Sequence, residues 1–351
     1  MPRILFLAGA VFLLPCAAQA ASASFDAPGR PLAATLQTLR ESATRPPEPP
    51  SVPANTVLRP IVLAISGVHP GELGVGLEFR HLLAMWKWLF PDEEPDEKRL
   101  HAELDLLRME MDALRPDGSV GDPGRNYIEE SMREAATRRR LSVDVEGFSW
   151  SRDPGDSRDS GNRLRGTLSA LGARAQGRPI YLVAHSWGTL LAHDALLQLA
   201  REGRPVAIER MVTMGSPLVP VNLVTRVFGR GGSIEEALQK RVAKPMGVAR
   251  WINLYSIHDP YAGTVSAADK NIRVDSRVDA YEQRLTELLD AGADPAAVGE
   301  DLKRLKNPFS WHSSYFGSFQ AKLQLLGEDL RWPIFEEHAD SILPRAETNG
   351  P

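Results

Sequence analysis

Two short apolar runs are the most strongly patterned parts of the chain. Residues 61–65 read Ile-Val-Leu-Ala-Ile, and residues 180–183 read Ile-Tyr-Leu-Val. A strand that is apolar on both faces is typical of a parallel sheet covered by helices on both sides. Further strands are predicted over 141–150, 210–217 and 251–257, where apolar residues alternate or run together before a polar turn.

Helical spacing of apolar residues separates these strands. After Gly188 the apolar residues Leu191, Ala195 and Leu199 repeat at steps of four, as on one face of a helix. Other segments that we expect to be helical are 73–90, 100–114, 126–138, 164–171 and the charged stretch 270–300. Residues 152–162, rich in Asp, Gly and Ser, are expected to form a surface loop. The alternation predicts an α/β fold with a mostly parallel central sheet and helices on both faces.

Composition places this fold in one large domain. The chain has 351 residues, of which 43% are apolar, so it can bury a single large core over residues 56–345. A proline-rich segment at the end of residues 21–55 excludes a continuous helix there and predicts an extended spacer, and residues 346–351 form a tail. The net charge of −4 and the lack of a basic stripe argue against nucleic acid as a partner.

Residues 1–20 have the pattern of a secretory signal peptide. Arg3 precedes an apolar run, and Ala18-Gln19-Ala20 is a small-x-small cleavage signal. A retained membrane anchor is the alternative interpretation, and lipidation at Cys16 is a third, although Pro15 fits that poorly. We therefore expect export to a periplasm or secretion. No other stretch predicts a membrane span, and cleavage after Ala20 removes the single cysteine, which excludes disulfides and cysteine-ligated metals from the mature chain.

The second apolar run ends in Ala184-His185-Ser186-Trp187-Gly188, where strand spacing gives way to helix spacing. Small residues two before and two after a serine let the backbone double back sharply. A serine that merely fills a tight turn is the simpler interpretation. The segment resembles the nucleophile region of the α/β-hydrolase superfamily, in its lipase and esterase-like branches, with Ala184 in place of the usual first glycine of Gly-x-Ser-x-Gly.

The resemblance implies that Ser186 is a nucleophile and that its acid and histidine partners follow it in that order. Asp259 is the predicted acid, because it directly follows the strand over 251–257 and the ligand edge of an open α/β sheet lies at the carboxyl ends of its strands. Asp269 and Asp275 are rivals without so clear a strand before them. An aspartate that caps a turn before Pro260 is the structural alternative.

His312 is the predicted general base. It lies in the segment Pro308–Phe316, which we interpret as a loop followed by a helix and which resembles the histidine loop of lipase-like proteins. His258 adjoins the acid and would point elsewhere in an extended segment, and His338 lies in an acidic, tail-like segment. His185 is expected to turn away from the substrate. A structural role for His312 remains the alternative.

The resemblance also implies an oxyanion hole and a cap. The backbone N–H groups of Val68 and Trp187 are its predicted donors, with Gly67 giving room for a substrate carbonyl. A plain glycine turn at Gly67 is the alternative. Residues 221–246, which contain a glycine-rich break, are predicted to form a helical cap over an acyl pocket.

Together these features predict an exported serine hydrolase that cleaves carboxylic esters without a metal or organic cofactor. The predicted export and the predicted cap favour acyl esters or lipids as substrates. The same three residues would also serve a thioesterase, amidase or peptidase, since one fold carries many chemistries. A non-catalytic binding protein of the same fold is the alternative from another class.

Overall fold

The computed structural model describes residues 58–67, 126–152, 156–221 and 232–344, together with residues 94, 96–98, 101, 102 and 105. The predicted signal peptide and tail lie outside the described residues, as do the predicted spacer and the helix over 73–90. Most of the predicted helix over 100–114 lies outside them too.

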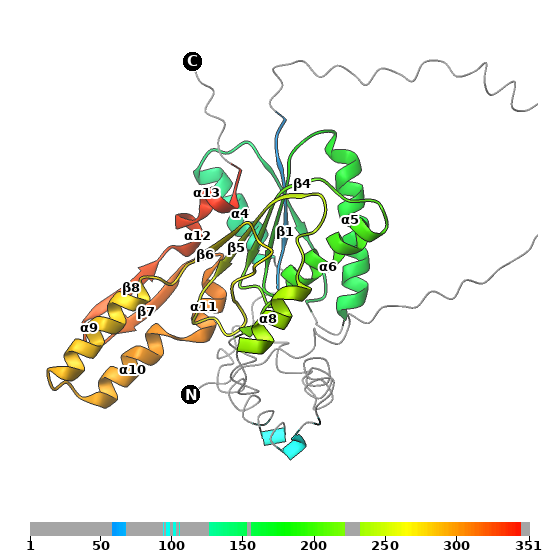
Figure 1. Ribbon diagram of the computed structural model, residues 1–351. Helices are drawn as coiled ribbons and strands as arrows, with labels where there is room; N and C mark the ends of the chain where they lie inside the picture. The colour runs from blue at the N-terminus through cyan, green and yellow to red at the C-terminus, as the bar shows by residue number, and fades with distance from the viewer. Residues whose placement is uncertain are drawn as a thin grey trace, which may run out of the picture. The chain divides into compact units, whose positions relative to one another are not determined.

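Six parallel strands form one sheet in the order β2-β1-β3-β4-β5-β6 (Figure 1). The strands are β1 Ile61–Ile65, β2 Asp144–Phe148, β3 Ile180–His185, β4 Ile208–Met214, β5 Val248–Tyr255 and β6 Lys270–Arg273. The first five confirm the strands predicted from the sequence. Every residue of β1 and β3 is buried, which explains why neither shows an alternating pattern.

Three helices cover one face of the sheet. They are α5 Ser157–Ala175, α6 Trp187–Arg201 and α8 Gly232–Arg241. Leu168 of α5 and Leu196 of α6 share a buried core with Leu63 of β1 and Leu182 of β3. The odd-numbered residues of β1 point to this face, so the first apolar run supplies half of its side chains to each layer.

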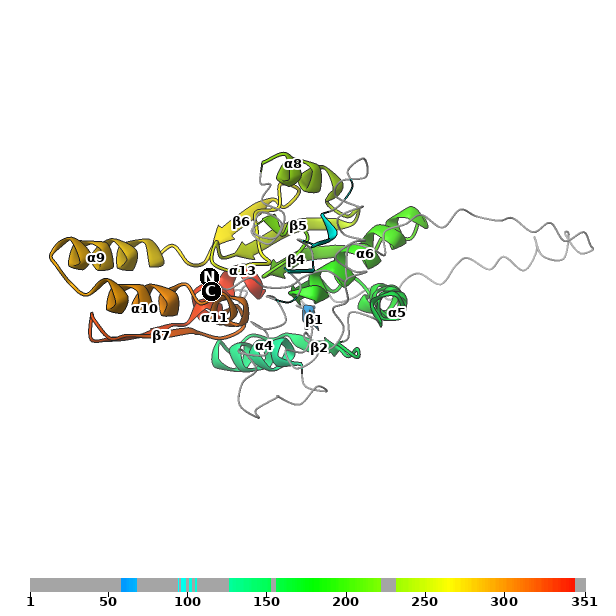
Figure 2. The same cartoon turned by 90° about the horizontal axis from the view of Figure 1, so that it is seen from below.

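The other face is covered by α4 and by the C-terminal elements, and Figure 2 shows α4 across the sheet from α5 and α6. These elements are α4 Tyr127–Arg138, α9 Val278–Asp290, α10 Pro295–Leu305, α11 Pro308–Ser314, α12 Ile334–Glu337 and α13 Ala339–Ile342, with a hairpin of β7 Phe319–Leu323 and β8 Glu328–Trp332. Helix α4 follows the prediction closely, because the side chain of Asn126 accepts a hydrogen bond from Glu129 N–H and caps its first turn.

Two expectations about local structure are wrong in part. Helix α5 begins at Ser157, so half of the expected loop over 152–162 is helical. Its first turns bury Ser160 and Gly161. The stretch 270–300 is not helical throughout, because Lys270–Arg273 is the edge strand β6, which pairs with β5. Three polar or charged residues and one isoleucine carry no strand pattern.

The strand order defines where a ligand would bind. From β1 the chain crosses to β2 on one side, and from β3 it proceeds through β4, β5 and β6 on the other side. In open α/β sheets the crevice at such a reversal, outside the carboxyl ends of the strands, is the usual ligand site. Residues that follow β1, β3 and β5 therefore lie at the edge where a site is expected.

Candidate active site

Ser186 occupies a strained turn between β3 and α6. Its φ of 51° and ψ of −130° are rare for a residue with a side chain. The turn is held because Thr189 N–H donates to the Ser186 carbonyl at 2.9 Å and the Thr189 hydroxyl donates to the same oxygen at 2.7 Å. This is the sharp strand-to-helix turn predicted from the spacing of Ala184, Ser186 and Gly188.

Gly188 is required by close packing rather than by its backbone angles. A Cβ atom there would lie 2.6 Å from the Ser66 carbonyl oxygen and 2.7 Å from the Ile65 carbonyl oxygen. We expect Gly188→Ala to lower the free energy of unfolding by ~2 kcal/mol or more, because backbone must move to admit the methyl group. Chemical denaturation measures this loss. Gly166→Ala is the control, since a Cβ atom at Gly166 meets nothing within 4 Å, and a Gly188→Ala protein as stable as the parent would contradict the prediction.

The structure brings Ser186, His312 and Asp259 into one hydrogen-bonded chain. His312 Nε2 lies 2.9 Å from Ser186 Oγ, and His312 Nδ1 lies 2.9 Å from Asp259 Oδ2. A carboxylate can only accept, so Nδ1 carries a proton and Nε2 presents its lone pair to the serine hydroxyl. The tautomer that a general base needs is therefore the one that Asp259 selects.

His312 lies within the short helix α11, not in a loop before a helix as the sequence analysis predicted. Its neighbour Trp311 is completely buried and anchors the helix: the Trp311 ring stacks on Phe319 at a centroid distance of 4.0 Å, and Trp311 Nε1–H donates to the Leu305 carbonyl at 2.9 Å. Through Trp311, His312 is thus held from one side by α10 and from the other by β7. The position of α11, and with it that of His312, therefore depends on elements that follow the central sheet in the chain.

Asp259 follows β5 and is completely buried. Its Oδ1 accepts from Tyr261 N–H at 2.9 Å, and its Oδ2 accepts from the Tyr315 hydroxyl at 2.9 Å as well as from His312. Hydrogen bonds to a carboxylate stabilise its charged form and fix its orientation. The pKa of Tyr315 is raised well above its usual value, first by burial and then by the charge of Asp259, so this hydroxyl keeps its proton.

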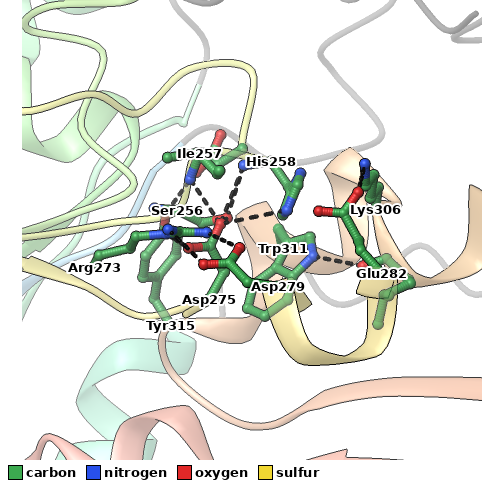
Figure 3. Close-up of polar contacts among 12 residues, drawn as sticks. Ser256, Ile257, His258, Arg273, Asp275, Asp279, Glu282, Lys306, Trp311 and Tyr315 are labelled. Carbon is green, nitrogen blue, oxygen red and sulfur yellow. Dashed lines mark hydrogen bonds and ion pairs between the residues drawn. The ribbon is translucent and has the colours of Figure 1, made fainter. Parts of the chain in front are cut away.

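The rival acids have other partners. Asp269 accepts from Trp251 N–H at 2.7 Å and pairs with Lys244. Asp275, which is completely buried, accepts from the Ser256 hydroxyl at 2.6 Å, from Ile257 N–H at 2.7 Å and from Arg273 at 2.6 Å (Figure 3). Asp275 thereby fixes the loop that leads to Asp259, and neither rival is bonded to His312.

His258 lies at the edge of this loop and is held neutral. Among the residues that the structure describes, His258 Nε2 is a buried side-chain nitrogen without a hydrogen-bond partner, 3.9 Å from Asp275 Oδ2. Burial lowers the pKa of His258 from 6.5 to about 4, against the charge of Asp275 and with help from Lys306 and Arg273. Figure 3 shows its ring between the Asp275 network and Lys306.

The lowered pKa of His258 predicts a loss of stability in acid. The unfolded chain binds a proton at this histidine below pH ~6.5, whereas the folded chain does so only near pH 4. The stability that neutral His258 contributes is therefore fully present above pH ~6.5. It is lost as the pH drops toward 4, by about 2 kcal/mol for this group. We expect His258→Phe to lessen the fall in Tm between pH 7 and pH 5. An equal fall in parent and variant would contradict this assignment.

The expectation that His185 turns away from the substrate stays a prediction, but the structure shows what this side chain contacts. It is buried beside the base, with ring centroids 4.8 Å apart, and its Nε2–H donates to the His312 carbonyl at 2.8 Å. Burial, followed by the proximity of His312, lowers the pKa of His185 well below 6.5. A neutral His185 thus links the end of β3 to helix α11, which carries His312. No local pattern in the sequence could reveal this contact over 127 positions.

Of the residues predicted to form the oxyanion hole, the structure describes Trp187 and Gly67. Trp187 is the first residue of α6, where backbone N–H groups and the helix dipole favour negative charge. A Cβ atom on Gly67 would lie 2.5 Å from Ser186 Cβ. The close approach of residue 67 to Ser186 therefore requires glycine, and it explains the glycine there better than a plain turn does. Val68, the other predicted donor, lies outside the described residues.

Two side chains beyond the end of β2 hold the Ser66–Gly67 loop. Trp150 Nε1–H donates to the Ser66 carbonyl at 3.0 Å, and Arg152 Nε–H donates to the Gly67 carbonyl at 2.8 Å. Arg152 is buried and has a φ of 64°, which costs energy for a residue with a side chain. Neither residue carries a signal in the sequence that identifies this role, and Arg152 falls in a stretch predicted to be a surface loop.

The described part of the predicted cap is attached to the domain at several points. Gln239 of α8 donates to the Thr264 carbonyl and accepts from Ser266 N–H, each at 2.8 Å. His193 Nε2–H of α6 donates to the Ala243 carbonyl at 2.8 Å, which holds the chain just after α8. Residues 222–231 lie outside the described part, so a cap over an acyl pocket remains a prediction.

The all-parallel sheet with helices on both faces confirms the predicted α/β fold, and the strand-turn-helix at Ser186 has the local geometry that the resemblance to the α/β-hydrolases implies. The helices of the described ranges include none long and apolar enough to cross a membrane. In the same ranges, no three His, Cys, Asp or Glu side chains come together as a possible metal site.

Comparison with solved structures finds similarities at low sequence identity. A hydrolase of the alpha/beta superfamily from Xanthomonas campestris pv. campestris is 14% identical over 66% of this chain and 99% of its own, with a TM-score of 0.30. The mature form of lipase BlEst2 from Bacillus licheniformis is 14% identical over 68% and 78% of the two chains, also with a TM-score of 0.30. No protein-family model and no curated protein matches the chain.

Proposed function

We propose that the protein is a serine hydrolase that cleaves carboxylic esters through an acyl-enzyme on Ser186. The observation that carries the proposal is the continuous chain from Ser186 Oγ through His312 to the buried Asp259, with both links at 2.9 Å. A serine hydroxyl is a poor nucleophile unless an adjacent imidazole takes its proton. A serine that only filled a turn would need neither partner.

The reaction follows from these positions. Ser186 Oγ attacks the acyl carbon while its proton passes to His312 Nε2, and Asp259 stabilises the imidazolium that forms. The Trp187 N–H, together with the predicted Val68 N–H, stabilises the oxyanion. His312 then returns the proton to the leaving alcohol oxygen as the ester bond breaks. Water, activated by His312, attacks the acyl-enzyme, which releases the carboxylic acid and restores Ser186.

The substrate class is proposed from the sequence features. A protein exported to a periplasm or secreted, with a cap candidate over 221–246, fits acyl esters or lipids better than soluble cytoplasmic metabolites. A thioester or amide would follow the same steps with a different leaving group. The hydrogen-bonded chain itself does not discriminate between these acyl compounds.

The experiment is hydrolysis of p-nitrophenyl esters from acetyl to palmitoyl, together with labelling by a fluorophosphonate probe. We expect turnover, and mass spectrometry should map the probe to the peptide that contains Ser186. The chain-length optimum separates an esterase from a lipase. Labelling without ester turnover would point to another acyl substrate, whereas a folded protein that is not labelled would favour the non-catalytic binding protein.

A further inference from the structure

Tyr315 bridges the acid loop and the carboxylate at the centre of the proposed site. Its hydroxyl lies 2.9 Å from Ser256 N and 2.9 Å from Asp259 Oδ2. A backbone N–H can only donate and a carboxylate can only accept, so the direction of both bonds is fixed: Ser256 N–H donates to the tyrosine oxygen, and the tyrosine O–H donates to Asp259. The hydroxyl is thus fully used by two fixed partners.

The surroundings are shaped to hold this bridge. Tyr315 is completely buried, and Gly215, which follows β4 with a φ of 56°, leaves room for it. A Cβ atom on Gly215 would lie 2.8 Å from Tyr315 Cε2 and 3.1 Å from Asp259 Oδ2. Ser256 is held in turn by its hydroxyl bond to Asp275, which is fixed by Arg273 (Figure 3). The bridge therefore ends on a rigid support.

Oδ2 of Asp259 accepts from both Tyr315 and His312. Two donors on one oxygen compete, because each one disperses part of the negative charge that the other would meet. The tyrosine hydroxyl consequently weakens the attraction between Asp259 and a protonated His312 while it fixes the carboxylate. The loss of this hydroxyl would leave more charge for the imidazolium, which favours its protonated form.

We propose that Tyr315 is a positioning residue that both orients Asp259 and sets the pH range in which His312 acts as the base. The proposal rests on the proposed function of Ser186, His312 and Asp259. Tyr315 does not touch the reacting atoms in it, and acts through the carboxylate alone. Other polar, titratable or charged groups surround Asp259 and His312. They are His185, Arg152 and Ser186 on the side of Ser186, Tyr261 on the loop of Asp259, and His258, Arg273 and Asp275 beyond Ser256.

The test compares Tyr315→Phe with the parent in the pH dependence of kcat/KM for p-nitrophenyl acetate. We expect the acid limb of the profile to move up by ~0.5 to 1 pH unit, since hydrogen bonds to charged acceptors are stronger than neutral ones. At the plateau we expect kcat to fall by roughly tenfold through looser orientation, with KM little changed. A purely structural role would lower kcat or Tm without moving the limb. Tyr281→Phe, which removes a hydroxyl on α9, is the control and should leave the profile unchanged.

A second readout needs no turnover. NMR of the imidazole of His312, assigned by its loss in His312→Ala, gives its pKa directly, and we expect this value to rise in Tyr315→Phe. If Tyr315→Phe does not fold, 3-fluorotyrosine incorporated at position 315 keeps both bonds and strengthens the donor, so the pKa of His312 should fall. An unmoved pKa in either folded variant overturns the proposal for Tyr315. A parent protein without turnover or labelling would instead overturn the proposed function, and the two failures are thereby distinguished.

Discussion

Ser186→Ala is expected to reduce kcat for a p-nitrophenyl ester by ~10⁴-fold or more, to the level that binding and the oxyanion donors alone sustain. The alanine has no atom that can form the acyl-enzyme, and the fluorophosphonate probe should no longer label the protein. The fold should persist, because the turn is held by Thr189 through the backbone carbonyl at position 186 and not through the serine hydroxyl.

The matched control is Ser276→Ala, an exposed serine that lies between β6 and α9. Its activity and labelling should equal those of the parent. Residual turnover in Ser186→Ala that matches the control would reject Ser186 as the nucleophile. Circular dichroism and Tm must be recorded for both proteins, so that a loss of activity is not confused with a loss of fold.

Asp259→Asn is expected to lower kcat by ~10⁴-fold while substrate binding is largely retained. The amide nitrogen can donate but cannot accept, so an asparagine no longer selects the tautomer in which His312 Nε2 faces Ser186. The site is also crowded with donors, since Tyr261 N–H, the Tyr315 hydroxyl and His312 Nδ1 all point at this side chain. We therefore expect a further loss of ~1 to 3 kcal/mol in stability.

Asp269→Asn is the control for this substitution, because Asp269 was the rival acid in the sequence and lies against Lys244 and Trp251. It should keep kcat within a few-fold of the parent. If Asp259→Asn retained full activity, the acid would have to be assigned elsewhere. A fall in both kcat and labelling rate in Asp259→Asn alone would match the expected loss of the tautomer in which His312 Nε2 faces Ser186.

The three residues of the proposed chain could be located from the sequence because each one lies near an element with a clear signal. Ser186 falls between a buried strand and an apolar helix, and Asp259 follows a strand directly. The order of the residues in the superfamily then left few histidines to choose from. The local structure at His312 was nevertheless predicted wrongly, since a short helix of Pro-Phe-Ser-Trp-His-Ser-Ser has no apolar period to reveal it.

The surrounding layer could not be predicted, because its contacts join distant parts of the chain. His185 meets His312 across 127 positions, Tyr315 meets Asp259 across 56, and Arg152 meets Gly67 across 85. Histidine, tyrosine and arginine are common in any sequence, and a single residue forms no spacing pattern that could predict its contact. The edge strand β6 escaped for a related reason, since its place in the sheet comes from pairing with β5 and not from burial of its own side chains.

The helix that carries His312 has a consequence for synthesis on the ribosome. Trp311, which anchors that helix, stacks on Phe319, and its ring centroid lies 6.0 Å from that of Trp332. The β7–β8 hairpin therefore forms part of the surface on which Trp311 packs, and of these elements it is translated last. Ser186 is translated 126 residues before His312. A nascent chain that ends before β8 would therefore present Ser186 without a firmly held His312, and the proposed hydrolytic activity should arise only after β8 has been translated.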